Sequence, residues 1–304
     1  MGLLPPGVHV MERGWLSANN VLLIGRDSTA LVDSGYCTHA TQTLELLRRR
    51  LGERRLDCLV NTHLHSDHCG GNAALQQAYP GLRTFIPPGH AEEVQRWDAV
   101  ALTYVSTGQS CPPFTFSDVL HPGETLALGD REWEVLAAPG HDPHAAVLFD
   151  SQSGTLLAGD ALWENGFGVV FPELEGEHAF EEVAATLDVI EHLRPALVVP
   201  GHGGVFTDVP MALGRARSRL DAYRADPRKH AAHAAKVLLK FRLLELQRVD
   251  YPEFSAWAMA TPYFRIVRNR WFPDEEISLW LKRLLAELEA AGAARLTDGF
   301  VVNM

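Results

Sequence analysis

The sequence predicts an α/β (α+β) fold with layered packing, followed by a helical C-terminal unit. Short apolar runs typical of strands alternate with segments of helical spacing over the first 225 residues. Glycine, proline and asparagine close most of these runs, as they do at turns. The length of 304 residues also exceeds that of a typical single domain. A large layered domain with a smaller appendage is therefore expected.

The chain is expected to open with a β-meander and to continue as helix, strand and helix. Apolar stretches separated by turn residues predict the strands, and leucines at helical spacing predict the first helix. That helix ends in Arg48-Arg49-Arg50, and positive charge suits a helix C-terminus. The expected elements are strands at Val8–Val10, Val21–Ile24, Ala30–Val32 and Asp57–Thr62, and helices at Thr41–Leu51 and Asn72–Ala78.

The next stretch, up to residue 225, repeats the alternation of strands and helices. Further strands are expected at Thr84–Ile86, Glu132–Ala137, Ala146–Phe149, Thr155–Ala158 and Leu197–Val199. Further helices are expected at Ala91–Trp97, Phe180–His192 and Pro210–Arg224. Interleaved strands and helices of this kind predict sheets covered by helices.

A boundary is expected near Arg224–Arg228, where a proline and polar residues precede a change to helical composition. The predicted domains are therefore residues 1–225 and 226–304. The Asp298-Gly299 dipeptide between two short apolar runs predicts a hairpin. Together with helices expected at Lys229–Val249, Pro252–Ala260 and Asp274–Ala291, it suggests a winged-helix-like unit.

The composition is that of a folded globular protein, with 46% apolar and 21% charged residues. No run of 18 apolar residues occurs, and Met1–Met11 does not resemble a signal peptide, so no membrane partner and a cytoplasmic location are expected. The four cysteines lack metal-ligand spacing and are expected to be free thiols, including the one beside His68: Cys37, Cys58, Cys69 and Cys111.

The charge is unevenly distributed along the chain. Residues 228–304 carry 12 Lys and Arg against 9 Asp and Glu, whereas residues 1–227 carry 15 against 29. The net negative charge of residues 1–227 repels phosphate polymers, so nucleic-acid binding by these residues is disfavoured.

Three histidines and an aspartate follow directly after a predicted strand. The segment reads Thr62-His63-Leu64-His65-Ser66-Asp67-His68-Cys69-Gly70-Gly71. Since alternate side chains of an extended chain share one side, His63 and His65 can reach one metal ion. Asp67 and His68 lie in the turn into the next helix, where the two glycines are expected to allow a sharp path that aims them at a second ion.

Three later residues follow predicted strands in the same way. His141 lies in Ala-Pro-Gly-His, Asp160 in Ala-Gly-Asp-Ala and His202 in Val-Pro-Gly-His. Each alone is also typical of a plain turn. Together with the first cluster, they indicate a metal site with seven ligand residues, which exceeds what one tetrahedral ion uses.

These motifs, in this order, resemble the metallo-β-lactamase-fold hydrolase superfamily, in its glyoxalase II-like or lactonase-like branch. The resemblance covers about residues 7–207 and extends to Leu31–Gly35, which is similar to a turn common in that family. It implies a four-layer αβ/βα sandwich with the site at one edge of two packed sheets.

The resemblance also implies how the ligands are shared. His63, His65 and His141 would hold one ion, Asp67, His68 and His202 the other, and Asp160 would bridge both. Two divalent ions can lower the pKa of a shared water and present hydroxide to an electrophilic carbonyl or phosphorus. Zinc is the expected metal, although iron or manganese also suit these ligands. Asp67 is expected to be catalytic as well as a ligand.

The expected substrate is a small ester, thioester or lactone. A bridging aspartate at position 160 resembles the ligand set of the thioesterase, lactonase and phosphodiesterase branches of the family, which disfavours β-lactams as substrates. The sequence does not match the glutathione-binding pattern of glyoxalase II. His144 is a candidate substrate-binding residue or a plain turn histidine, and the other histidines, His233 among them, are given no role. The segments 97–118 and 163–171 are interpreted either as an apolar lid or as loops that cover the core.

The alternative function is RNA or phosphodiester cleavage. Its support is a small basic cluster in the tail, Arg265, Arg268 and Arg270, among aromatic residues. The tail has too few concentrated charges to neutralise several phosphates, so it is expected to shape the substrate opening or a homodimer contact instead. Its aromatic residues are expected to be buried against the catalytic domain or a second subunit: Trp257, Tyr263, Phe264, Trp271, Phe272 and Trp280.

Overall fold

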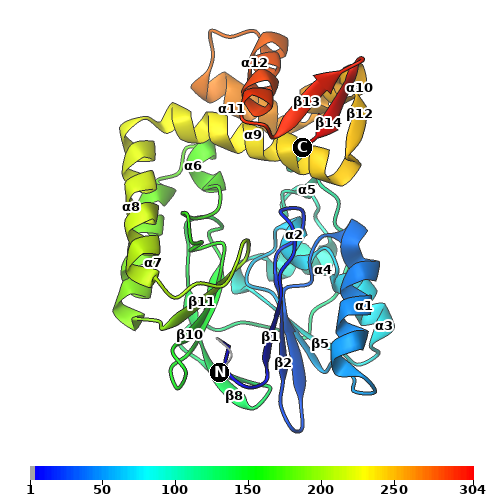
Figure 1. Cartoon of the computed structure of the whole chain (residues 1–304), viewed down its shortest axis with the longest axis vertical. Coiled ribbons are helices and arrows are strands. Elements are labelled where there is room, and N and C mark those ends of the chain that lie inside the picture. The colour runs from blue at the N-terminus through cyan, green and yellow to red at the C-terminus, as the bar shows by residue number, and fades with distance from the viewer. Residues whose placement is uncertain (1–3) are drawn as a thin grey trace.

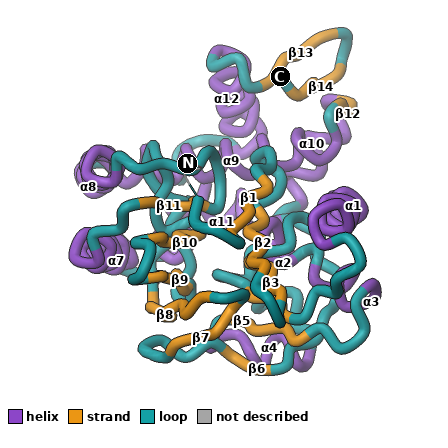
Figure 2. The backbone as a smooth tube through the Cα atoms, turned by 60° about the horizontal axis from the view of Figure 1, so that its bottom comes forward, coloured by secondary structure: helices purple, strands orange, loops and turns teal. Residues whose placement is uncertain are grey.

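The computed structural model describes residues 4–304, which form two packed sheets with helices on both outer faces and a helical unit at one end (Figure 1). In Figure 2 the order of layers is helices, sheet, sheet, helices. This arrangement confirms the predicted αβ/βα sandwich. Within the described residues, no helix combines the length and the apolar character that a membrane crossing requires.

The first sheet has six strands in the order of the chain. Its strands are β1 (Val8–Met11), β2 (Asn20–Ile24), β3 (Thr29–Val32), β4 (Cys58–Val60), β5 (Arg83–Ile86) and β6 (Asp118–Val119). The first three strands form the expected antiparallel meander, and β3 to β6 run parallel. Parallel neighbours require crossovers, and these contain η1 (Cys37–His39), α1 (Ala40–Leu51), α2 (Ser66–Cys69), α3 (Asn72–Ala78), η2 (Pro88–His90), α4 (Ala91–Arg96) and α5 (Tyr104–Thr107).

The second sheet has five strands in the order β11-β10-β9-β8-β7. Their bounds are β7 (Thr125–Leu128), β8 (Arg131–Ala137), β9 (Ala146–Asp150), β10 (Thr155–Gly159) and β11 (Leu197–Pro200). The one parallel pair, β10 with β11, is connected through α6 (Phe171–Glu175) and α7 (Ala179–Leu193). After β11 the chain continues into α8 (Val209–Ala225).

Both faces of the central strands are buried, because each strand lies between the other sheet and a helix layer. In β2, Val21 and Leu23 belong to the cluster between the sheets, whereas Leu22 belongs to the cluster under α1 and α3. In β10, Leu157 faces the other sheet and Leu156 faces α7 and α8. The two-residue period of a strand therefore fills two cores at once.

The tail contains four helices and a small sheet. They are α9 (Pro227–Leu246), β12 (Arg248–Asp250), α10 (Tyr251–Ala260), α11 (Pro262–Trp271), α12 (Ile277–Ala290), β13 (Ala294–Thr297) and β14 (Phe300–Asn303). The predicted hairpin is confirmed, with positive φ at Asp298 and Gly299 as a two-residue type I′ turn requires. Two expectations were wrong: Val249 lies in a strand rather than a helix, and α11 was not predicted.

The tail packs on the sandwich through its aromatic residues. Phe264 and Trp280 are buried in one cluster with Val169 and Leu174, which precede and form part of α6. The Tyr263 hydroxyl donates to the Phe171 carbonyl at 3.2 Å. These aromatic side chains are thus buried within a single chain. The helix break between α8 and α9 coincides with the predicted boundary at residue 225, and the division into domains stays a prediction.

Candidate metal centre

The first four candidate ligands lie where β4 of the first sheet ends. His63 and His65 precede α2, and Asp67 and His68 lie on α2 itself. The helix has a single turn, and after Gly70 and Gly71 the next helix, α3, begins at Asn72. This short turn brings four side chains to one point at the edge of the sheet.

The other three candidates come from loops that follow strands of the second sheet. His141 follows β8, Asp160 follows β10 directly and His202 follows β11. The structure brings all seven predicted residues together in three overlapping groups with donor atoms within 4.8 Å of one another: His63, His65 and His141; His63, His68 and Asp160; Asp67, His68 and His202. Strand ends on facing sheets are thus the physical reason for the convergence.

Asp160 lies between the two ends of the cluster. Its Oδ2 atom is 3.5 Å from His141 Nε2 and 3.8 Å from His202 Nε2, and its Oδ1 atom is 3.4 Å from His68 Nε2. At the far end, His202 Nε2 is 3.0 Å from Asp67 Oδ2. The Asp160 carboxylate therefore contacts His141 on one side of the cluster and His68 and His202 on the other, as a ligand shared by two ions would.

The imidazole nitrogens fit a cation at the centre of the cluster. His141 Nε2 lies 2.8 Å from His65 Nδ1 and 3.2 Å from His63 Nε2. Within the part of the chain that the structure describes, His68 Nε2 is buried and has no hydrogen-bond partner. Because Nδ1 of both His63 and His141 donates elsewhere, the Nε2 lone pairs of these two rings face one another at 3.2 Å and repel, and a buried nitrogen without a partner is costly. A divalent ion would satisfy both conditions, so the donor set fits a metal centre.

Three histidines are oriented by hydrogen bonds from their other ring nitrogen. His63 Nδ1 donates to the Thr62 hydroxyl at 3.2 Å, His68 Nδ1 donates to Asp33 Oδ2 at 2.7 Å, and His141 Nδ1 donates to the Val169 carbonyl. Each bond fixes the tautomer that leaves the second nitrogen free for a metal.

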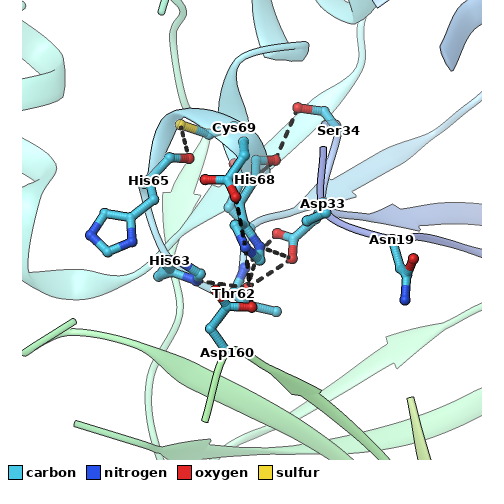
Figure 3. A network of polar contacts seen from close by, with 12 residues as sticks. Asn19, Asp33, Ser34, Thr62, His63, His65, His68, Cys69 and Asp160 are labelled. Atoms are coloured by element: carbon cyan, nitrogen blue, oxygen red, sulfur yellow. Dashed lines mark hydrogen bonds and ion pairs between the residues drawn. The ribbon is translucent and has the colours of Figure 1, made fainter. Parts of the chain in front are cut away.

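Asp33 is the principal residue whose role the sequence did not reveal. Its carboxylate also accepts from the Thr62 amide at 2.9 Å and the Thr62 hydroxyl at 2.8 Å, so it joins the turn after β3 to the ligand loop (Figure 3). Its φ of 58° is unusual for a residue other than glycine. The available signal was the Leu31–Gly35 turn, in which an aspartate follows a buried strand.

Burial and neighbouring charges set the protonation of the cluster. Burial, together with the charge of His141, lowers the pKa of His65 to about 4, so this imidazole is neutral at pH 7. Burial alone would also lower the pKa of His68, but the charges of Asp33, Asp160 and Asp67 outweigh it and hold that pKa well above its ordinary value. An environment that favours a positive charge at His68 also favours a cation beside it.

The two glycines after the ligand loop serve a different purpose from the predicted one. Their φ angles, −61° for Gly70 and −82° for Gly71, are ordinary for any residue, so a sharp path does not require glycine. Instead the backbone lies against the turn after β3. An added Cβ on Gly71 would be 2.5 Å from the Ser34 carbonyl oxygen, and one on Gly70 would be 2.7 Å from the Cys37 amide nitrogen.

We expect Gly71→Ala to destabilise the fold by about 1–3 kcal/mol, the range for overpacking a closely packed site. Urea unfolding would measure this loss. Gly214→Ala, in the middle of α8 with nothing within 4 Å of the added Cβ, is the control and should be neutral or slightly stabilising. Equal stability of the two variants would contradict the close approach described here.

A cavity of about 630 Å³ opens beside the cluster. Five of the seven candidates line it, whereas His63 and His68 are buried behind them. From segment 97–118 only polar residues reach the cavity, Thr103, Thr107 and Gln109, because Tyr104 and Phe114 are buried in the core under α4. Segment 163–171 contributes Trp163, Glu164, Asn165, Val169 and Phe171. The second segment thus brings aromatic side chains to the cavity, and the choice between a lid and a core-covering loop stays a prediction.

His144 lies outside the cavity lining, since its ring packs against His90 and over Gly89. Its assignment as a substrate-binding residue stays a prediction. Cys69 is a buried free thiol whose sulfur lies 3.2 Å from the Tyr104 hydroxyl. All four cysteines are free, as predicted.

Two tryptophans lie at the cavity: Trp15, which the sequence analysis did not single out, and Trp163, which begins the segment interpreted as a lid or a core-covering loop. Trp15 stacks on His202 with ring centroids 5.3 Å apart, and Trp163 packs edge-on against both rings. The Trp163 indole N–H donates to Asp160 Oδ1 at 3.1 Å. These contacts hold two candidate ligands in place, and only the position of Trp163 close after Asp160 could have indicated one of them.

Comparison with known proteins agrees with this geometry. The profile of the metallo-beta-lactamase superfamily matches residues 13–202, which is more than half of the chain. The chain belongs to the metallo-beta-lactamase superfamily. Membership confirms the resemblance inferred from the His-x-His-x-Asp-His motif and the later Gly-His and Gly-Asp turns.

Curated relatives of this metallo-beta-lactamase superfamily chain are hydroxyacylglutathione hydrolases. One from Synechococcus sp. is 29% identical over 189 residues, which cover 62% of this chain and 65% of the relative. Another from Cyanothece sp. is 34% identical over 163 residues, which cover 51% and 54%. The chain thus spans less than two thirds of the length of these relatives. They agree with the expectation of a hydrolase and leave the substrate open.

Solved structures of the superfamily share the fold. A metallo-beta-lactamase family protein from Thermus thermophilus is 21% identical, with a TM-score of 0.58 over 100% of both chains. A beta-lactamase domain protein from Burkholderia ambifaria is 22% identical, with a TM-score of 0.63 over 88% of both chains. A third protein, solved in a di-iron-bound form, is 25% identical, with a TM-score of 0.53 over 67% of this chain and 96% of its own.

Proposed function

We propose that the chain is a dinuclear-metal hydrolase that cleaves a small ester, thioester or lactone. The observation that carries this proposal is the position of Asp160, whose carboxylate contacts imidazoles of both groups within 3.8 Å. His63, His65 and His141 would hold one ion, and Asp67, His68 and His202 the other, with Asp160 between them. Two divalent ions would supply activated water and polarise the substrate carbonyl.

The residues of the chain would contribute orientation and a water-poor environment. Thr62, Asp33 and the Val169 carbonyl fix the ligand tautomers, so little rearrangement is needed when metal binds. Asp67 is proposed as the catalytic carboxylate, because it lines the cavity and contacts His202. Phe171 packs against His65 and helps to exclude water from that side.

Zinc is the proposed metal. Five imidazoles and two carboxylates suit zinc, and they also suit iron or manganese. The relative solved in a di-iron-bound form supports two ions in a related fold and keeps iron as the second candidate. Elemental analysis of protein purified with added zinc, iron or manganese would identify the metal. A stoichiometry that stays at one ion would contradict the dinuclear proposal.

A panel of substrates on metal-loaded protein tests the reaction class. We expect turnover of thioesters, esters or lactones and none of β-lactams, with a His65→Ala variant as the inactive control. The hydroxyacylglutathione hydrolase relatives support the thioester arm. If phosphodiesters or RNA alone were cleaved, the proposal would be replaced by the nuclease alternative.

The nuclease alternative receives little support from the tail. None of Arg265, Arg268 and Arg270 lines the cavity. Arg268 donates to the Glu275 carbonyl, and Arg270 lies against Trp271. Two of the three arginines are thus engaged within the chain, and three charges do not form the continuous basic surface that tracks a nucleic-acid backbone.

A further inference from the structure

The far wall of the cavity is formed by one face of α9. Figure 1 shows α9 crossing the end of the sandwich, above the loops that follow the strands. Its lining residues recur every three or four positions, as residues on one helix face do. They are His233, Lys236, Val237, Lys240, Phe241 and Leu244, with Leu238 beside them, and Glu287 and Leu288 of α12 and the following Ala291 complete the wall. This wall is an apolar stripe flanked by basic groups and by the carboxylate of Glu287.

Two of those basic groups are already engaged within the chain. Lys236 Nζ lies 2.8 Å from Glu287 Oε2 in an ion pair. Lys240 Nζ donates to the carbonyls of Ala293 and Met304 and to the Asn303 side chain, which uses the three donors of an ammonium group. Neither lysine is left to bind a ligand.

Arg219 differs from both lysines. It projects from α8 into the cavity, and among residues 4–304 no carboxylate lies within ion-pair distance of its guanidinium. Glu164 also lines the cavity, but its carboxylate lies 3.9 Å from Arg215. A guanidinium that faces a half-enclosed cavity without a counter-charge favours an anion there.

The position of Arg219 is fixed relative to the candidate metal centre. Its guanidinium lies against Gly166, where an added Cβ would be 2.5 Å from Nη1. Gly166 pairs with Trp163, whose indole bonds to Asp160. Burial, with the charges of Arg219 and Lys236, lowers the pKa of His233 to about 4, so this neighbour is neutral at pH 7. Among residues 4–304, Arg219 of α8 is thus the cation of the cavity lining that is not engaged by a partner.

We propose that Arg219 binds a single negative charge on the substrate, while the apolar stripe of α9 binds the hydrocarbon between that charge and the scissile carbonyl. The inference rests on the proposed function and names its substrate class: an ester or thioester whose aliphatic chain ends in a monoanionic group such as a carboxylate. Val237, Phe241 and Leu244 would contact the chain, and burial of each methylene would add affinity.

Binding of linear alkyl sulfonates to the metal-loaded full chain tests this inference. A sulfonate carries one charge and is a poor metal ligand. By isothermal titration calorimetry we expect affinity to rise up to about fourfold per added methylene from hexyl to decyl sulfonate. Arg219→Gln should weaken octyl sulfonate about tenfold, because a charge-assisted hydrogen bond is lost. Arg215→Gln, one turn earlier on α8 and outside the cavity lining, is the matched control and should bind as wild type does.

Three results would overturn the inference. They are no sulfonate binding by the wild type, equal binding by Arg219→Gln, and equally tight binding of octanol. Because binding requires no turnover, a failure of the hydrolysis panel leaves this measurement intact, and the two proposals fail separately. For any ester that is hydrolysed, Arg219→Gln should raise KM for the anionic substrate and leave its uncharged analogue unaffected.

Discussion

Asp160→Asn is expected to lower kcat by at least about 100-fold while the protein remains folded, because even the outer partners of metal ligands are worth 10–100-fold. The substitution removes one negative charge from a site where Asp160 contacts His68, His141 and His202. Metal content should fall with activity, since the bridging position would be lost. Steady-state hydrolysis and elemental analysis of the same preparation measure both effects.

The matched control is Asp188→Asn, the same chemical change on the surface of α7, where the side chain is 73% exposed. It should retain activity and metal content. Asp67→Ala, which removes the proposed catalytic carboxylate, should be as inactive as Asp160→Asn. A native circular dichroism spectrum with a wild-type rate in the Asp160 variant would remove this residue from the proposed centre.

Asp33→Ala is expected to weaken metal binding 10–100-fold, the range for partners that orient metal ligands. It also leaves the amide and the hydroxyl of Thr62 without their acceptor, next to His68. Since each buried unsatisfied group costs about 1–3 kcal/mol, the free energy of unfolding should fall by at least about 2 kcal/mol. Metal titration measures the loss of metal affinity, and urea unfolding measures the loss of stability.

Asp33→Asn separates the loss of stability from the loss of metal affinity. Asparagine tolerates the positive φ of this position and keeps one acceptor oxygen, so more of the stability should be retained. It cannot stabilise a positive charge on His68, so metal affinity should still fall. If both variants bound metal as tightly as the wild type, Asp33 would have only a structural role.

The ligand residues could be predicted because each lies at the end of a strand that its own sequence defines. An apolar run followed by a turn fixes the place of His63, His141 or His202 along the chain, and strand ends meet at sheet edges. The hairpin at Asp298-Gly299 was predictable for the same local reason. Such features depend on neighbours within a few residues.

The features that sequence did not reveal depend on distant contacts. Gly71 must be glycine because Ser34 lies against it, and no local pattern contains that approach. Arg219 matters because it faces the cavity and no carboxylate of the described residues pairs with it, which only the packing of α8 and α9 determines. The helix α11 was missed because Pro262 begins it directly after α10, with Thr261 alone between the two helices.

Because α9 forms one wall of the cavity, the residues that contact a ligand there are encoded separately from the candidate metal ligands. The superfamily profile ends at residue 202, yet Arg219, the α9 stripe and Leu288 all lie beyond it. The stretch that carries the candidate ligands and the stretch that selects a ligand for the cavity are thus encoded one after the other in the gene. Exchange of the tail by recombination could change the preferred substrate without changing any candidate metal ligand. The superfamily match thus covers the stretch with the candidate metal ligands, whereas the proposed substrate preference of this chain depends on residues beyond that match.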